Sequence, residues 1–584
     1  MSQRLGDTCV LVLLSGLLFL TNLGGPKLWD RDEPRNAGCA SEMLQRNDWV
    51  TPTFNAQLRP HKPVLLYWGM MVSYSLFGVT EFGARLPSAL CGSGTVLLTY
   101  FIGRRLFSRE AGMWAAIALA TTMMFGVAAR AATPDALLIF LITLALGIYV
   151  FSTSFADDEV ILFPRFWPSV VMYLVMGLAT LAKGPVGFIL PTAIIGMFLL
   201  IRRLPSTDVG VGSWWQPGWT LLRSFHPGHF LKTCLFMRPL TAILSILAVA
   251  LPWYLWVHVR TEGAWTYGFF IQHNVRRATS SMEGHGGGVW FYPVALLVGF
   301  FPWSVFWIPA LHDGVSECKE KSNHKAGYLF AACWVGVYLV LFTIAKTKLP
   351  SYITPCYPGV ALLMGVFLSR LAAGSVALSR LWTGITLGTV TAVGVAIAIA
   401  VPKASEVFLP GEALLGVVGA VLIVAGFIAL IRGYQQRMQD SLRILAGGAI
   451  AFSLALFAIA PMQVNKYRGL DEIVSHLQTD EEPTSLLSFA CLEPSWVYYA
   501  GQPIEEHGAP EQVLARWQES LDSGEQPRII TTQTEFQRLR PHLQSVPYHV
   551  ESTPYFLKDE TVVVLSPGKA EPLQIASDGN QVIR

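Results

Sequence analysis

The sequence predicts an all-α protein with many membrane-spanning helices and a small α/β domain near its C-terminal end. Three observations carry this prediction. Of the 584 residues, 52% are hydrophobic and only 14% are charged, whereas soluble domains carry about 25% charged residues. Apolar runs recur along most of the chain, and after about Val464 the composition becomes charged and polar. A bilayer is the solvent that accommodates so much apolar surface.

The apolar runs are long enough to cross a membrane. A spanning helix needs about 20 apolar residues, and this criterion predicts about 13 spans. They cover roughly residues 8–24, 87–103, 111–129, 134–154, 166–182, 184–201, 239–257, 289–310, 327–345, 352–369, 382–402, 411–431 and 444–463. Residues 1–463 are therefore expected to form a transmembrane domain.

The positive charges predict the orientation. If the N-terminus is cytoplasmic, the loops on that side repeatedly hold Arg and Lys, as in Arg104-Arg105 and Arg202-Arg203, which is the positive-inside bias. An odd number of spans then places residues 464–584 outside the cytoplasm. Within them, β-like runs at 485–490, 528–532 and 561–565 and helical runs around 510–521 and 535–543 predict the α/β domain.

Composition and motifs also argue against several classes of function. A formal net charge of +3 is too small to indicate nucleic-acid binding, and the eight cysteines are scattered singly, without a CxxC pair. No glycine-rich phosphate loop for a nucleotide is present. Many of the informative residues lie in two long outer loops, 25–86 and 258–288, and the others lie in shorter outer turns. The run 65–77 in the first loop suits a helix lying in the interface rather than crossing the membrane.

Carboxylates stand close to the predicted outer face. Asp32 and Glu33 come a few residues beyond the first span, where a carboxylate is placed to act as a general base or to bind a metal. The alternative is a solvated helix N-cap, since Asp32 precedes an apparent helix. Asp135 lies in the next outer turn, where it is placed to orient Lys62 or Arg130.

Cations gather at the same face. Positive charges on the outer side of the membrane oppose the positive-inside bias, so they indicate a binding site for an anionic ligand, with phosphate the first candidate. The alternative is that they are unrelated side chains that snorkel to the membrane surface. The predicted phosphate-binding residues are Lys62, Arg276, Lys346 and Lys348, with Tyr352 assisting. Further site candidates are Arg35, His61, Arg130, Lys183, His273 and His285. A divalent cation is a possible cofactor, with Asp32, Glu33 and His61 as its possible ligands.

Seven ordered elements stand between Trp29 and about Leu363: Asp32-Glu33-Pro34-Arg35, Asn47-Asp48-Trp49, His61-Lys62-Pro63, Lys183-Gly184-Pro185, Leu251-Pro252-Trp253-Tyr254, Gln272-His273-Asn274-Val275-Arg276 and Lys346-Thr347-Lys348-Leu349-Pro350-Ser351-Tyr352. Together they resemble the bacterial lipid A aminoarabinose transferases, within the wider protein mannosyltransferase-like superfamily of integral membrane glycosyltransferases called GT-C. The departures are His61 and Gln272, which stand at acidic positions of that family and leave fewer acidic partners for an ammonium-bearing sugar.

The resemblance implies a GT-C fold and a sugar donor linked to undecaprenyl phosphate or a similar polyprenol. The acceptor would be an envelope lipid such as lipid A, or, in a protein O-mannosyltransferase-like alternative, a protein. It also implies a bacterial inner-membrane protein whose C-terminal domain is periplasmic. A transporter or flippase of polyprenyl-linked substrates is the alternative from another class. Its expected internal repeats and midplane charges are not evident in the sequence, which favours an enzyme.

Overall fold

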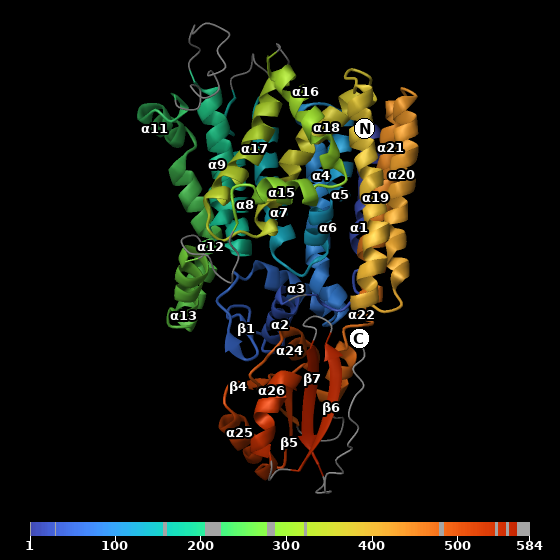
Figure 1. The fold of residues 1–584 in the computed structure, drawn as a ribbon. Helices are drawn as coiled ribbons and strands as arrows, with labels where there is room; N and C mark the ends of the chain where they lie inside the picture. The colour runs from blue at the N-terminus through green and yellow to red at the C-terminus, as the bar shows by residue number, and fades with distance from the viewer. Residues whose placement is uncertain are drawn as a thin grey trace. The chain divides into compact units, whose positions relative to one another are not determined.

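The computed structural model describes residues 2–29, 31–155, 161–204, 223–276, 287–319, 324–477, 484–543, 547–555 and 560–568. The chain divides into two compact units (Figure 1). The first comprises Met1–Leu28 and Cys39–Met462, and the second comprises Trp29–Gly38 and Gln463–Arg584. The units divide between Met462 and Gln463, and the expected organisation into a transmembrane domain at 1–463 and an extracytoplasmic domain at 464–584 stays a prediction. The sequence did not predict that Trp29–Gly38 groups with the C-terminal residues.

The first unit is helical apart from a short hairpin, β1 and β2, that precedes α3. Figure 1 shows its long helices running side by side. Its elements are α1 (Ser2–Leu20), α2 (Asp32–Gln45, which begins in the second unit), β1 (Thr53–Phe54), β2 (Gln57–Leu58), α3 (Leu65–Phe77), α4 (Glu81–Leu106), α5 (Arg109–Ala120), α6 (Met123–Arg130), α7 (Asp135–Phe151), α8 (Phe166–Lys183), α9 (Val186–Arg202), α11 (Pro227–Phe236), α12 (Pro239–Arg260), α13 (Ala264–Tyr267), the π-helix η1 (Gly268–Val275), α15 (Phe291–Gly299), η2 (Trp303–Phe306), α16 (Trp307–Lys319), α17 (Lys325–Ile344), η3 (Pro350–Cys356), α18 (Tyr357–Ala372), α19 (Arg380–Phe408), η4 (Ala413–Gly416), α20 (Val417–Tyr434), α21 (Met438–Leu454), η5 (Ala455–Ile459) and α22 (Ala460–Asn465).

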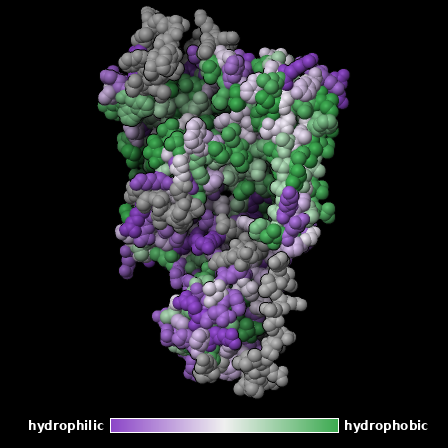
Figure 2. Space-filling model, in the orientation of Figure 1, coloured by the Kyte–Doolittle hydropathy of each residue, from purple (hydrophilic) through white to green (hydrophobic). Residues whose placement is uncertain are grey.

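The helices confirm a polytopic membrane protein. Among the described residues, nine helices are long and apolar enough to cross a membrane, or up to 11 if the bent pairs α5–α6 and α15–α16 each count as one span. The pairs bend by 68° and 115°, so the predicted span 289–310 is two helices. The apolar helices α7 and α9 are shorter. Every predicted range falls on one or more of these elements, with 111–129 covering the bent pair α5–α6, and the total of thirteen crossings stays a prediction. Figure 2 shows hydrophobic side chains on the visible flank of these helices.

Small residues let the helices approach closely. A Cβ on Gly103 of α4 would lie 2.8 Å from the Cα of Gly112 in α5, and one on Gly365 of α18 would lie 2.5 Å from the Ala111 carbonyl oxygen. Membrane helices associate through such backbone contacts because the bilayer removes most of the hydrophobic drive between them. This packing fixes the helix ends from which the candidate site is built.

The second unit contains a five-stranded mixed sheet with the order β4-β3-β5-β7-β6. The strand β3 runs parallel to β4 and β5, whereas β7 is antiparallel to β5 and β6. The three predicted strands and two predicted helices are confirmed, and β4, β6, α23 and α24 are additional. The elements are α23 (Leu470–Leu477), β3 (Thr484–Phe489), α24 (Pro494–Ala500), β4 (Glu505–His507), α25 (Pro510–Asp522), β5 (Gln526–Thr532), α26 (Gln533–Leu539), η6 (Arg540–Leu543), β6 (Tyr548–Tyr555) and β7 (Glu560–Pro567).

Candidate functional site

A cavity of about 180 Å³ in the first unit is lined by five of the predicted site residues, His61, Lys62, Lys183, His273 and Tyr352. It is formed by the ends of α7, α8 and α17, by η1 and η3, by α9, and by the loop that precedes α3. Charged and polar groups from separate parts of the sequence therefore meet at one place. The lining residues are His61, Lys62, Leu138, Lys183, Val186, Leu190, Phe269, His273, Phe342, Ala345, Thr347, Tyr352 and Pro355.

An ion pair joins the last residue of α8 to the first residue of α7. The ammonium of Lys183 donates a hydrogen bond to the Asp135 carboxylate, and the two side chains are only 16% and 15% exposed. Lys62 also acts electrostatically on Asp135. Buried charges persist only when they are paired, so this carboxylate organises the cations around it. Of the two partners expected for Asp135, the structure places Lys62 near it.

The turn after Lys183 requires glycine. Gly184 has a φ of +82° and a ψ of −154°, a combination that essentially only glycine adopts. A Cβ at this position would lie 2.6 Å from Cζ of Phe269, which lines the cavity from η1. Pro185 then starts α9 with a fixed φ. The Lys-Gly-Pro element thus ends α8 and brings its lysine against the wall formed by η1.

Two imidazole rings and a tyrosine complete the polar wall. The ring centroids of His61 and His273 are 4.0 Å apart with an interplanar angle of 33°. The Lys183 ammonium nitrogen lies 5.8 Å from the centroid of the Tyr352 ring. Ammonium, imidazole and phenol groups are all able to donate hydrogen bonds to phosphate oxygens. The cavity is therefore equipped to bind an anionic group.

The other predicted phosphate ligands are placed differently. Lys348 is buried, donates a hydrogen bond to the carbonyl oxygen of Thr343 at 2.7 Å, and has its ammonium nitrogen 5.4 Å from the Tyr292 ring centroid. Lys346 and Arg276 are exposed. None of these three is among the residues lining the cavity within the described chain. His285 lies outside the described residues.

Arg130 binds backbone carbonyl groups rather than Asp135. Its guanidinium is buried and donates to the carbonyl oxygens of Leu18 at 2.8 Å, Thr21 at 2.9 Å and Phe457 at 3.1 Å. The last four carbonyls of a helix lack intrahelical donors, and α1 ends at Leu20. Arg130 therefore satisfies backbone acceptors at the end of α1 and in η5, so of the two alternative partners expected for Asp135 it is not the one found.

Asp32, Glu33 and Arg35 belong to the second unit. Asp32 is exposed and is the first residue of α2, so it lies inside the helix rather than preceding it as a cap. Glu33 is buried and accepts a hydrogen bond from the Trp29 backbone N–H at 2.5 Å. Among the described residues no three His, Cys, Asp or Glu side chains group closely enough to hold a metal ion, and the metal ligands expected at Asp32, Glu33 and His61 stay a prediction.

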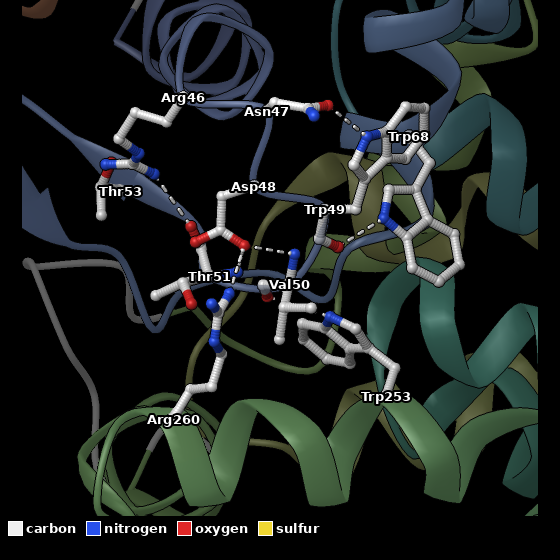
Figure 3. Close-up of polar contacts among 10 residues, drawn as sticks. All are labelled: Arg46, Asn47, Asp48, Trp49, Val50, Thr51, Thr53, Trp68, Trp253 and Arg260. Carbon is white, nitrogen blue, oxygen red and sulfur yellow. Dashed lines mark hydrogen bonds and ion pairs between the residues drawn. The ribbon is translucent and has the colours of Figure 1, made fainter.

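The loop leading to His61 and Lys62 is fastened by Asp48 (Figure 3). Its Oδ1 accepts hydrogen bonds from the backbone N–H groups of Val50 at 2.9 Å and Thr51 at 3.2 Å, and from the Arg260 guanidinium at 2.9 Å. Partial burial opposes ionisation of Asp48, but these donors outweigh it and hold the pKa of its carboxyl below its ordinary value. The Asn-Asp-Trp element thus positions the loop.

Three indole N–H groups bind the backbone of the same loop. Trp68 donates to the Trp49 carbonyl at 2.8 Å and Trp253 to the Val50 carbonyl at 3.1 Å, both visible in Figure 3. Trp265 donates to the Arg59 carbonyl at 3.0 Å. The Pro-Trp-Tyr element, through Trp253, therefore holds the loop that leads to His61 and Lys62. Sequence reasoning missed the lining residues Phe269, Phe342 and Thr347, which carry no charge to mark them.

Comparisons with known proteins agree with this architecture. Residues 61–209 match the family model for dolichyl-phosphate-mannose-protein mannosyltransferase. The undecaprenyl phosphate-alpha-4-amino-4-deoxy-L-arabinose arabinosyl transferase of Pectobacterium carotovorum is 30% identical over 470 residues, which cover 79% of this chain and 77% of that protein. The protein of the same name from Pseudomonas aeruginosa is 31% identical over 378 residues, covering 64% of this chain and 62% of that protein.

A solved structure has the same fold. The crystal structure of ArnT from Cupriavidus metallidurans bound to undecaprenyl phosphate matches with a TM-score of 0.74 and 23% sequence identity. The match covers 97% of this chain and 98% of that chain, so it includes the membrane helices and the C-terminal sheet. The predicted fold class is thereby confirmed.

Proposed function

Because the chain belongs to the family of the undecaprenyl phosphate-α-4-amino-4-deoxy-L-arabinose arabinosyl transferases, we propose that it is a membrane glycosyltransferase that takes its sugar from an undecaprenyl-phosphate-linked donor. The observation that carries the proposal within this chain is the cavity in which Lys62, Lys183, His61 and His273 converge. A lipid-linked phosphate brings negative charge to the membrane surface, and ammonium groups in a confined site are suited to bind it.

The proposed reaction is a single displacement at the anomeric carbon. An oxygen of the acceptor forms the new bond, the bond from the anomeric carbon to the phosphate oxygen breaks, and undecaprenyl phosphate leaves with the electron pair. Negative charge then grows on the leaving phosphate. Lys62 stabilises that charge, while Asp135 holds Lys183 in place beside it. Tyr352 adds a hydroxyl donor to the same wall.

Asp32 is proposed as the general base for a hydroxyl acceptor. A hydroxyl must lose its proton as it attacks, and the exposed Asp32 is available to take it. Loss of a general base lowers rates by about 10²–10⁴-fold, whereas loss of a helix-terminal carboxylate costs about 1 kcal/mol of stability. If the acceptor is a phosphate, which is already ionised, Asp32 would instead position the sugar.

Asp32→Asn tests this role because it keeps the side-chain shape and removes the base. The transfer rate should fall at least about 100-fold with a hydroxyl acceptor, in a well-folded protein. Asp440→Asn is the matched control: it removes a carboxylate from the first turn of α21, a helix that does not line the cavity, and should leave the transfer rate unchanged. An Asp32→Asn protein that transfers at the wild-type rate would exclude the carboxylate from the chemistry.

The sugar and the acceptor are separate questions that one assay answers. Purified protein in liposomes is supplied with undecaprenyl phosphate carrying either 4-amino-4-deoxy-L-arabinose or neutral L-arabinose, together with lipid A or a peptide. Mass spectrometry then follows the acceptor and released undecaprenyl phosphate. We expect transfer to lipid A. The match of residues 61–209 to a protein mannosyltransferase model favours a protein acceptor as the second candidate. No transfer, with donor moved across the bilayer, would indicate a flippase.

The orientation is also a proposal. The distribution of Arg and Lys favours a cytoplasmic N-terminus and a C-terminal domain outside the cytoplasm, and the bacterial relatives favour the inner membrane, with that domain in the periplasm. A phosphatase reporter fused after Arg584 should be active, and a reporter active only in the cytoplasm would reverse this topology. The donor site would then face the periplasm, where envelope acceptors are available.

A further inference from the structure

Trp29 is the first residue of the segment Trp29–Gly38, which carries Asp32. It packs against Arg468, a buried arginine that lies more than 400 residues later in the sequence. Cζ of Arg468 lies 5.1 Å from the centroid of the Trp29 ring, and Arg468 is only 1% exposed. A guanidinium over an indole face within about 6 Å is a favourable cation–π contact. Both residues belong to the second unit, so the contact is internal to that unit.

The turn that contains Arg468 packs directly against strand β6 of the sheet. Gly469, the next residue, has a φ of +63°, and a Cβ there would lie 2.5 Å from the Pro554 carbonyl oxygen and 2.8 Å from Cγ2 of Thr553. These two residues belong to β6. Glycine therefore lets the turn lie directly on the strand. The position of Arg468 follows from the fold of the sheet rather than from a loose linker.

A second contact joins the segment to the same domain. Arg31 forms an ion pair with Glu493 at 3.7 Å, and the Glu493 side chain is 9% exposed. Glu493 immediately precedes α24. Within the segment, Glu33 accepts the Trp29 backbone N–H. Trp29, Arg31 and Glu33 are thus all engaged, while Asp32 between them is exposed.

We propose that the C-terminal domain is a positioning device for the Asp-Glu-Pro-Arg element, in which Arg468 and Glu493 hold Trp29 and Arg31 and so fix the placement of Asp32. This inference rests on the proposed transferase function with Asp32 at the reacting centre. Arg468 and Glu493 are positioning residues, because they act through the segment and not on substrate. A domain needed only for folding would have no reason to engage the residues on both sides of an exposed carboxylate.

Kinetics separate positioning from folding. Misplacement of a reacting group by about 1 Å is enough to lower a rate by about 100-fold, so Arg468→Gln should lower kcat by about 10- to 100-fold. The donor cavity lies in the first unit, so KM for the undecaprenyl-phosphate-linked donor should stay unchanged. Arg468→Lys keeps a cation and should recover most of kcat, and Trp29→Phe should do so by keeping an aromatic face. Trp29→Leu should behave like Arg468→Gln.

The matched control is Arg516→Gln. It removes an ion pair of the same domain, the 2.9 Å contact of Arg516 with Glu505, away from the segment. Its kcat should equal that of wild type. A second pair of variants, Gly469→Ala and Gly524→Ala, tests the same point. Both glycines have a positive φ, but only at Gly469 would the added Cβ collide with other atoms. Gly469→Ala alone should lower kcat.

Hydrogen–deuterium exchange of the peptide spanning residues 29–38 tests the anchor without any substrate. Arg468→Gln should raise exchange there at least about threefold, a change expected when local opening becomes easier, and Arg516→Gln should leave it unchanged. Unaltered exchange and kcat in Arg468→Gln would overturn the inference, as would equal losses in Arg468→Gln and Arg516→Gln. Wild-type protein that never transfers sugar would refute the proposed function instead, while the exchange result still decides whether the anchor exists.

Discussion

Replacing Gly184 with alanine should damage the donor cavity, because the added methyl group would strain the backbone and collide with Phe269, a residue of the cavity wall. The residue combines a φ of +82° with a Cβ position 2.6 Å from the Phe269 ring. A side chain in this backbone region costs about 1–3 kcal/mol, and overpacking against the ring costs about 1–3 kcal/mol more. The sum of about 2–6 kcal/mol would be relieved by moving Lys183 away from Asp135 or by displacing η1.

The assay is thermal inactivation in detergent combined with binding of undecaprenyl phosphate. Gly184→Ala should shorten the half-life and weaken binding. Gly374→Ala is the control, since Gly374 has a φ of +73° with nothing within 4 Å of an added Cβ, and so carries the conformational cost alone. Adding Phe269→Leu to Gly184→Ala should restore part of the binding. Gly184→Ala with the stability and affinity of Gly374→Ala would refute the steric argument.

Two further outcomes follow from paired charges. Lys183→Met leaves the Asp135 carboxylate buried without its ion-pair partner and should lower the free energy of unfolding by about 3–5 kcal/mol. The double variant Lys183→Met/Asp135→Leu should be more stable than Lys183→Met in thermal inactivation. Equal stabilities of the two variants would contradict the buried pair. The depressed pKa of Asp48 means that its stabilising contribution is complete above the ordinary value of 3.8 and is lost as the pH falls through the folded-state value. Exchange of the peptide 47–60 should therefore rise on acidification below that value, and Asp48→Asn should remove this pH dependence; a variant that keeps it would exclude Asp48 as the source.

The sequence predicted the parts of the fold that have strong periodicity. Apolar runs marked the membrane helices, and β3, β5 and β7, which are central in the sheet, were found as apolar β-like runs. The strands β4 and β6 were missed because both are at the edges, β4 is only three residues long, and β6 is largely polar. Edge strands need no continuous apolar run, so composition marks them weakly.

The charged part of the site was predictable, but its partners were not. Lys62, Lys183 and Asp135 were identified because charges at a membrane face need a reason. Arg130 has the same sequence signal, yet it binds backbone carbonyls at the end of α1. Only tertiary structure distinguishes a ligand-binding cation from one that satisfies a helix end, because both are buried charges beside a turn.

The grouping of Trp29–Gly38 with the C-terminal residues also orders events during synthesis. The segment leaves the ribosome early, whereas its partners Arg468 and Glu493 are made near the end. At about 5–20 residues per second, the interval is roughly 20–90 s. During that interval the membrane helices insert with the segment unanchored. A chain truncated before Arg468 lacks both partners, so under the proposed anchoring its segment Trp29–Gly38 would stay unanchored after the membrane helices have inserted.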